Sequence, residues 1–450
     1  MNSIRKPSRF AVFLAVFYAL EPLFGKSQLA DLPYVWVIHM ILGCGICILL
    51  FALAFISACN FSSSNFPLNR NAIFISVLLI GVWGIIAALY QDSSLSELLY
   101  IINWELMVIT CWVVAPPLLN NLPTLRFIKY LNVPLKLALF ASLFVLLFDK
   151  SFNLLDPVYR PKGIFVNTTS LGDAAIICCL LSTAQLSLKS IRHSLIEKLT
   201  YILPFLCLLL TKSRIPISAT FIAVFMAWLI ILRPKAKLFL VYSLLILLFF
   251  FYIVISAGSG PNTVVGKIAT ILRIKEVRDA LDESRMTAWT TNYDLMIQHP
   301  TFGMGFTTRW TSSGGLNIKS RLSTDGDRDS QLEDINPSLY DPHNFFLTFG
   351  KSLGILGLVL ATFMILSIIF MGTRILIFHH IYNNVSAILV FELSIVLFIL
   401  SATSDPLISF GSVFDRFAWI LLGVVSFNYN MQYGANTAAV NNSGHSFLIR

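Results

Sequence analysis

Long apolar stretches separated by short polar segments run through almost the whole chain. Most approach the roughly 20 residues that an α-helix needs to cross a bilayer. The predicted spans are residues 10–24, 33–58, 72–90, 96–116, 133–149, 168–186, 200–212, 215–232, 238–257, 345–372, 384–402 and 412–428. Because the apolar residues within each stretch are continuous rather than alternating, the pattern favours helices over barrel strands. It predicts an all-α integral membrane protein with about 12 transmembrane helices.

The longest polar interruption, residues 258–344, divides the predicted spans into two groups. It follows a Gly, Ser and Pro turn, and its apolar residues return every three or four positions, which predicts amphipathic helices. The predicted organisation is an N-terminal transmembrane bundle (1–257, about nine helices), one large, mainly helical loop domain (258–344), C-terminal transmembrane helices (345–428) and a tail (429–450).

Composition supports a membrane protein, since 56% of the 450 residues are hydrophobic and only 12% are charged. A soluble globule of this size needs more polar residues to cover its surface. Most basic residues outside the spans fall on one side when the N-terminus is placed in the cytoplasm, as the positive-inside rule requires. This orientation predicts a multi-pass membrane protein whose loop domain lies on the side opposite the cytoplasm. The first span is expected to be retained, because it lacks a small-residue cleavage site, and no nucleic-acid partner is predicted.

A few basic residues depart from this rule. Arg160 and Lys162 lie in a short outer loop, and Lys212 and Arg214 interrupt two apolar runs in "LLLTKSRIPISAT". An ionised side chain at membrane depth costs about 2.5–3.5 kcal/mol, so such residues usually face a cavity and a charged partner. The cluster indicates a bound anion. The alternative is that these side chains reach out to lipid headgroups at ordinary helix ends.

Three other motifs carry weaker signals. Cys44 and Cys47 form a CxxC inside a predicted span, without the second pair that a metal site needs, so helix packing is the favoured interpretation. The acidic stretch "STDGDRDSQLEDIN" has Ser330 and Asn336 where a calcium loop requires Gly and Glu. "GKSLG" around Ser352 matches a nucleophile motif by letters but lies in an apolar helix. No metal and no cofactor are predicted.

The loop domain contains one stretch that combines a helix with a glycine-rich stop. Arg285 and Trp289 lie four residues apart, hence on one helix face. Pro300 ends that helix, and we interpret His299 as part of this stop rather than as a catalytic group. Gly303 and Gly305 follow, in a loop where the backbone is expected to approach a ligand closely.

Four segments together resemble one known family. "HNFFLTFGKSLGILG" places His343 and Asn344 before Gly354 and Gly357, and it follows "RPKGIFVN" at 160–167, the "SR" at 213–214 and "SRMTAWTTNYDLMIQHPTFGMGF" at 284–306. In this order they resemble the O-antigen ligase and polysaccharide polymerase family, over residues 155–370. Roughly the first 150 and the last 80 residues are similar only in being hydrophobic.

The resemblance implies an enzyme that takes a glycan from undecaprenyl diphosphate and transfers it to an acceptor hydroxyl at the periplasmic face. The ligase branch uses lipid A core as the acceptor, and the polymerase branch uses a second lipid-linked glycan. We favour the ligase, because the histidine motif fits its pattern in full. The expected partners are therefore the lipid-linked donor, the acceptor and membrane lipids.

The chemistry assigns roles to the basic residues. Displacing a diphosphate develops negative charge on the leaving oxygen, which a guanidinium can stabilise through two hydrogen bonds. Arg214 and Arg285 are the first candidates, and Arg160, Lys162 and Lys212 are auxiliaries that bind the diphosphate. This is a glycosyl transfer that requires no metal.

His343 is the candidate base, because an imidazole with an ordinary pKa near 6.5 can accept the proton of the acceptor hydroxyl. The alternative is that it only hydrogen-bonds at the start of a helix. Asn344 and Trp289 are candidate substrate contacts. Lys351 either adds a cation near the diphosphate or reaches to lipid headgroups.

Two other classes of protein remain open. A transporter or flippase for an anionic lipid or polysaccharide would use the same arginines, but the two similar halves common in such proteins are not visible in the sequence. A non-catalytic assembly partner would leave His343 dispensable.

Overall fold

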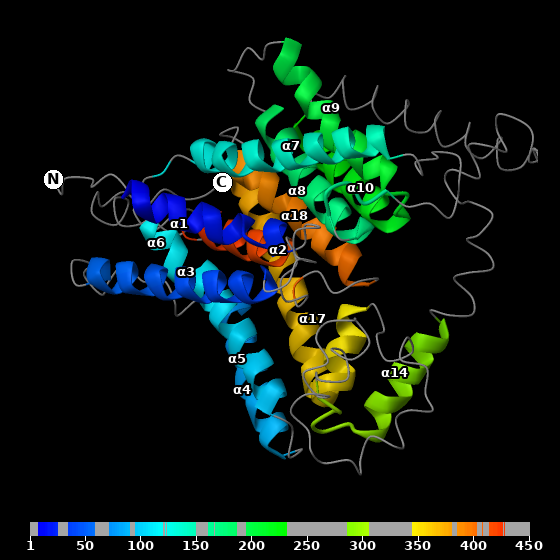
Figure 1. Ribbon diagram of the computed structural model, residues 1–450. Coiled ribbons are helices and arrows are strands. Elements are labelled where there is room, and N and C mark those ends of the chain that lie inside the picture. Colours follow the sequence, from blue (N-terminus) through cyan, green and yellow to red (C-terminus); the bar gives the residue numbers. More distant parts are fainter. Residues whose placement is uncertain are drawn as a thin grey trace, which may run out of the picture.

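The computed structural model describes residues 8–25, 35–58, 72–90, 95–119, 122, 124–149, 161–165, 167–186, 195–231, 286–305, 344–379, 385–402, 407, 414–425 and 427. Within these ranges the chain is helical and contains no β-strand, so the all-α prediction is confirmed for this part (Figure 1). The predicted span at 238–257 lies outside the described residues.

The helices follow the apolar runs closely. They are α1 (Arg9–Leu20), α2 (Pro22–Gly25), α3 (Val35–Ala58), α4 (Ala72–Tyr90), α5 (Leu95–Ile109), a π-helical turn (Thr110–Val114), α6 (Ala115–Leu118), α7 (Thr124–Phe148), α8 (Thr168–Leu186), α9 (Leu195–Leu210), α10 (Arg214–Ile231), α14 (Met286–Gln298), α17 (Phe345–His379) and α18 (Val385–Ser401). Residues 414–425 are also helical.

Five stretches in the described part are long and apolar enough to cross a membrane. They are Ala72–Tyr90, Leu98–Leu118, Leu125–Phe148, Thr168–Leu186 and Phe345–Ile375. Five shorter apolar helices accompany them, so the chain has the helices of a multi-pass membrane protein. The total of about 12 spans, the periplasmic loop and the domain boundaries stay predictions.

One predicted boundary is wrong by nine residues. We expected a span from residue 133, but α7 begins at Thr124. Polar residues such as Asn132 lower the hydropathy of its first turns, and Pro134 is a usual helix breaker. Both are accommodated inside the helix, where Leu131 and Leu135 are fully buried.

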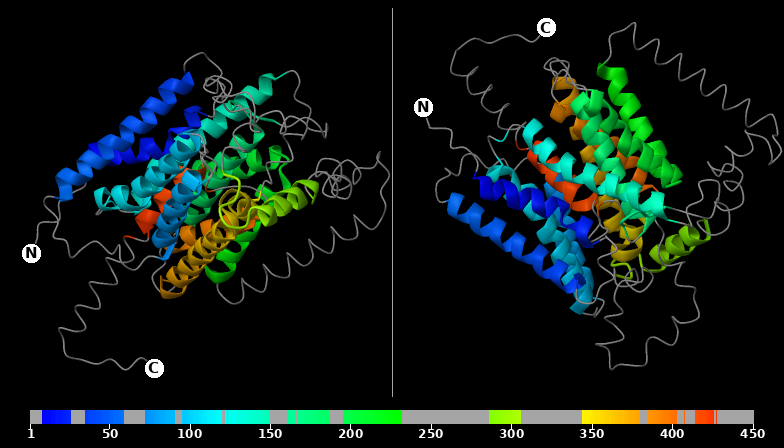
Figure 2. Two further views of the ribbon diagram at one scale, coloured as in Figure 1. Left: turned by 90° about the horizontal axis from the view of Figure 1, so that it is seen from below. Right: turned by 45° about the horizontal axis from the view of Figure 1, so that its top comes forward.

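α8 is the central helix of one half of the molecule. Nearly all of its side chains are buried, and α7, α9, α10 and α18 pack around it. α18 also packs along α17, which in turn contacts α4 and α14. Figure 2 shows α1 and α3 on one side of the bundle and α9 and α10 on the opposite side.

Polar contacts join helices that are far apart in the sequence. Glu21 and Arg416 form a buried ion pair, and the guanidinium lies 4.6 Å from the centre of the Tyr18 ring. Thr183 on α8 donates to Glu392 on α18 at 3.0 Å. In an apolar environment such bonds hold helices together where the hydrophobic effect does not.

Candidate active site

The long helix α17 is interrupted at Gly354. This residue has φ 72° and ψ −166°, a conformation that is almost confined to glycine. An ideal Cβ added there would lie 2.4 Å from the carbonyl oxygen of Pro300. The sequence therefore needs glycine at this position for two reasons, its backbone angles and the close approach of the loop at 299–305.

The loop at 299–305 and the interruption of α17 form one joint, which we call the glycine joint. In a continuous helix Ile355 N would donate to Lys351 O, but here it donates to Pro300 O at 2.8 Å. Lys351 O instead accepts from Met304 N at 2.7 Å, and Ser352 O accepts from Gly305 N at 3.0 Å. The loop thus satisfies backbone groups that the interruption would otherwise leave unpaired.

Gly303 completes the joint from the loop side. Its φ is 70°, and an ideal Cβ would lie 2.4 Å from the backbone carbon of Ser352. We expected Gly303 and Gly305 to let the backbone approach a ligand, but in the structure they let it approach α17. The glycine-rich loop is a tertiary contact, which the sequence pattern alone does not distinguish from a binding loop.

Aromatic side chains of α4 support the joint. Phe302 stacks between Trp83 and Tyr90, with ring centres 5.1 and 4.1 Å apart. Trp83 Nε1 also donates to the carbonyl of Leu353 at 3.0 Å, which satisfies another group beside the interruption. The joint is therefore held from three elements, α4, α17 and the segment that follows α14.

α14, which carries Trp289, packs against α17. Among its described side chains, Ala288, Asn292 and Met296 are buried, and an ideal Cβ at Gly350 would lie 2.6 Å from Met296 Sδ. Trp289 is partly buried next to this face. The helix ends at Gln298, as the His299–Pro300 stop predicts. Arg285 directly precedes α14 and lies outside the described residues.

Asn344 begins α17. Its Oδ1 accepts from Phe346 N at 3.0 Å and from Leu347 N at 3.1 Å, which makes it the N-cap. Its Nδ2 donates to the carbonyl of Ala402, just after α18, at 2.9 Å. The side chain therefore positions the start of the helix. His343 directly precedes it and lies outside the described residues.

Lys351 is enclosed by protein, with 1% of its surface exposed. The expectation that it reaches out to lipid headgroups is therefore wrong, since an enclosed ammonium group does not contact headgroups. Neighbouring Ser352 is also buried, and its carbonyl belongs to the glycine joint. Its place at an interrupted, closely packed helix agrees with the packing interpretation of "GKSLG".

The break between α9 and α10 is present as predicted. α9 ends at Leu210 and α10 begins at Arg214. Lys212 in between has φ 52°, and only 6% of its surface is exposed, so it does not reach out to headgroups either. Ser213 O accepts from Ile217 N at 3.2 Å as the new helix starts. The structure describes the backbone of Arg214 but not its side chain.

Lys162 lies in a second region, at the end of α7. Its side chain is exposed, on a turn between α7 and α8. Arg160 lies outside the described residues. The structure therefore brings Trp289 and Asn344 to α17 and its neighbours, and it leaves Lys162 and Lys212 on the elements around α8.

Sequence reasoning missed the buried charges inside the predicted spans. Glu21, Glu392 and Arg416 were absorbed into apolar runs, although single ionisable residues at membrane depth are the signal that marks such positions. No group of three or more His, Cys, Asp or Glu residues that could hold a metal occurs in the part of the chain that the structure describes. Cys47 contacts the Thr110 hydroxyl at 2.9 Å, and both Cys44 and Cys47 are free thiols.

Comparison with known proteins gives one match. Residues 199–362 match the family model described as O-antigen ligase. The matched segment runs from α9 into α17, so it contains the α9–α10 break, α14 and the whole glycine joint. It confirms the family resemblance found in the sequence. None of the curated proteins matches the chain.

Proposed function

We propose that this chain, which matches the O-antigen ligase family model at residues 199–362, transfers a glycan from undecaprenyl diphosphate to an acceptor hydroxyl at the periplasmic face of the inner membrane. The match supports an enzyme of the ligase or polymerase type, with lipid-linked glycan substrates. Of the two, we propose the ligase acting on lipid A core, and the alternative is the repeat-unit polymerase.

The glycine joint is the observation that carries this proposal. It fixes the end of α14 to the end of the first segment of α17 through three backbone hydrogen bonds. These two helices begin directly after Arg285 and His343, the residues to which we assign the diphosphate and the acceptor. From each of these two residues the chain runs through one helix to the same joint.

In the proposed reaction the acceptor oxygen attacks the anomeric carbon of the donor glycan. The bond from that carbon to the diphosphate oxygen breaks, and undecaprenyl diphosphate leaves with the electron pair. His343 accepts the acceptor proton or orients the hydroxyl. Arg214 and Arg285 stabilise the charge that develops on the leaving diphosphate, because fixed guanidinium groups need no reorganisation in the transition state.

The remaining candidates take supporting roles in this proposal. Lys212 lies two positions before Arg214 in the chain, and Trp289 lies four positions after Arg285. Arg160 and Lys162 are assigned to the diphosphate from the segment between α7 and α8. Asn344 is assigned a positioning role, because its side chain caps α17 and binds the carbonyl of Ala402. His343 is its neighbour in the chain, so we assign Asn344 the role of orienting the segment that carries the proposed base.

The test is deletion of the gene in its host, followed by comparison of glycans on the lipid carrier and on lipid A core. Long glycans that accumulate on the carrier beside bare lipid A core support a ligase. Single repeats on the final acceptor, with long chains lost everywhere, support a polymerase. Unchanged glycans would reject both.

Complementation with His343→Ala tests the mechanism. The variant must reach the membrane in the same amount as the wild-type protein. We expect it not to restore glycan transfer, whereas full restoration would indicate a non-catalytic assembly role.

A further inference from the structure

The turn after α7 is fixed on the helix by Gly163. This glycine has φ 60°, and an ideal Cβ there would lie 2.4 Å from the Cβ of Ser142. Ile164 N donates to the Ser142 hydroxyl at 3.4 Å, and the adjoining Phe165 is fully buried. Phe165 N closes the turn on the carbonyl of Lys162 at 3.0 Å. The backbone of Lys162 is therefore held at a defined place beside the end of α7.

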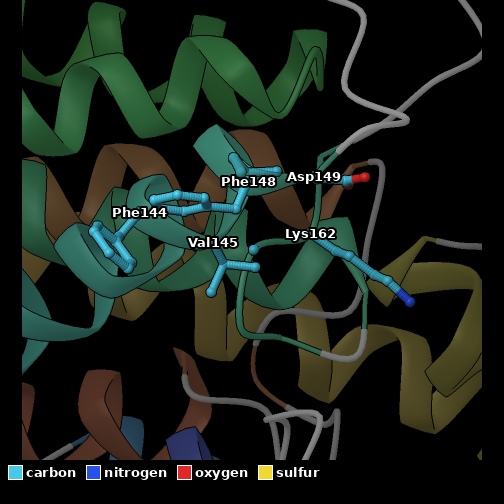
Figure 3. A pocket seen from close by; sticks show the side chains of 7 residues that line it. Phe144, Val145, Phe148, Asp149 and Lys162 are labelled. Atoms are coloured by element: carbon cyan, nitrogen blue, oxygen red, sulfur yellow. The ribbon is translucent and has the colours of Figure 1, made fainter.

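This turn and the end of α7 line an open pocket of about 480 Å³, which we call the α7 pocket. Its lining consists of Phe144, Val145, Leu146, Phe148, Asp149, Lys162 and Gly163. Figure 3 shows the rings of Phe144 and Phe148 on one side, with Lys162 extending from the turn away from them. The ring centres are 4.8 Å apart.

The pocket combines an apolar floor with a cation at its mouth. Phe148 is 70% exposed, and Val145 and Phe144 are exposed as well, although they belong to a helix that is apolar enough to cross a membrane. Asp149 also lines the pocket, and Figure 3 shows it on the same side of the two rings as Lys162. A volume of this size fits a ligand of several hundred daltons. A ligand with a hydrocarbon chain against Phe144, Val145 and Phe148 and an anionic group beside Lys162 would complement this lining.

We propose that the α7 pocket binds the first isoprene units of a polyprenyl diphosphate donor and that Lys162 pairs with its diphosphate. This inference rests on the proposed function, from which it takes the donor class. The new element is the binding site, which is a pocket on the exposed surface of α7. Lys162 lies two residues after Arg160, which the proposed function already assigns to the same diphosphate.

The experiment measures binding of a polyprenyl diphosphate to the purified full-length protein in nanodiscs of neutral lipid. Val145→Trp fills the pocket, and we expect it to weaken binding roughly tenfold, equivalent to about 1.4 kcal/mol. Leu137→Trp is the matched control, because Leu137 is 64% exposed on the same helix but does not line the pocket. It should bind like the wild-type protein.

Lys162 is tested through its charge. Lys162→Ala should weaken binding about two- to fivefold, the range of an exposed ion pair, and Lys162→Arg should restore it. The difference between wild type and Lys162→Ala should shrink at high salt, since exposed charges are screened. Phe148→Ser is a second pocket variant in case Val145→Trp does not fold. Its control is Phe140→Ser, because Phe140 is 62% exposed on α7 and does not line the pocket.

Each outcome separates this inference from the proposed function. If the wild-type protein does not bind the polyprenyl diphosphate, both fail. If it binds and the pocket variants bind equally well, the α7 pocket is not the donor site, but the proposed function stands. If phosphatidylglycerol competes as well as the diphosphate and is equally sensitive to Val145→Trp, the pocket holds ordinary lipid and the assignment to the donor is overturned.

Discussion

Gly354→Ala is the sharpest test of the glycine joint. An alanine at φ 72° and ψ −166° carries strain of about 1–3 kcal/mol. Its Cβ would lie 2.4 Å from Pro300 O and 2.6 Å from Thr301 O, so the loop must move away. That movement endangers the three backbone hydrogen bonds of the joint, worth about 0.5–1.5 kcal/mol each. Together we expect a loss of about 3–7 kcal/mol in the free energy of unfolding.

The assay is unfolding of the purified protein in mixed micelles by a denaturing detergent, followed with a thiol-reactive dye. Cys111, Cys178 and Cys179 are fully buried and react only when the bundle opens. The control is Gly45→Ala in α3, where an added Cβ meets nothing within 4 Å and alanine is the better helix former by about 1 kcal/mol.

Glycan transfer in membranes is measured on the same two variants. We expect transfer to be lost in Gly354→Ala and retained in Gly45→Ala, because the joint holds the elements next to Arg285 and His343. If Gly354→Ala is as stable and as active as Gly45→Ala, the reasoning that the joint organises the site is refuted.

Substitutions test three further contacts of the helix bundle. Glu21→Gln leaves the Arg416 guanidinium buried without its carboxylate, so we expect the free energy of unfolding to fall by about 3–5 kcal/mol. The double variant with Arg416→Met should recover part of this loss, and additive losses would contradict direct pairing. Asn344→Ala removes the cap of α17 and should cost about 1 kcal/mol, whereas Asn344→Asp should keep the cap and lose only the bond to the carbonyl after α18; equal stability of both variants would contradict the capping role. Thr183→Val removes the donor to the buried Glu392, which should cost about 1–3 kcal/mol in the same unfolding assay, and an unchanged midpoint would show that this bond does not contribute.

The sequence predicted the helices of the described part well, because membrane helices are a local property. An apolar run satisfies its own backbone hydrogen bonds and excludes water, so hydropathy alone identifies it. Hydropathy predicted both ends of α8 correctly. It missed the first turns of α7, where polar residues such as Asn132 lower the hydropathy. Asn132 is tolerated because it donates to Gln185 at 3.1 Å and accepts from Cys178, partners that lie on another helix.

The sequence also identified the glycines of this region, but not the contact that the structure shows for them. Gly303 and Gly305 were expected to face a ligand, and they face α17. A glycine marks a place where the backbone comes close to something or takes unusual angles. The local sequence does not identify the group that the backbone approaches.

The sequence by itself thus determined a helical, apolar chain, the positions of its breaks at Lys212 and Pro300, and the family to which its residues 199–362 are similar. Only the tertiary structure decided that the loop after α14 and the interruption of α17 are one joint. It also decided that Glu21 pairs with Arg416, 395 positions away. The reason is that helix formation depends on residues within about one turn of each other. These contacts join residues that are far apart in the sequence, so they depend on how the helices pack together.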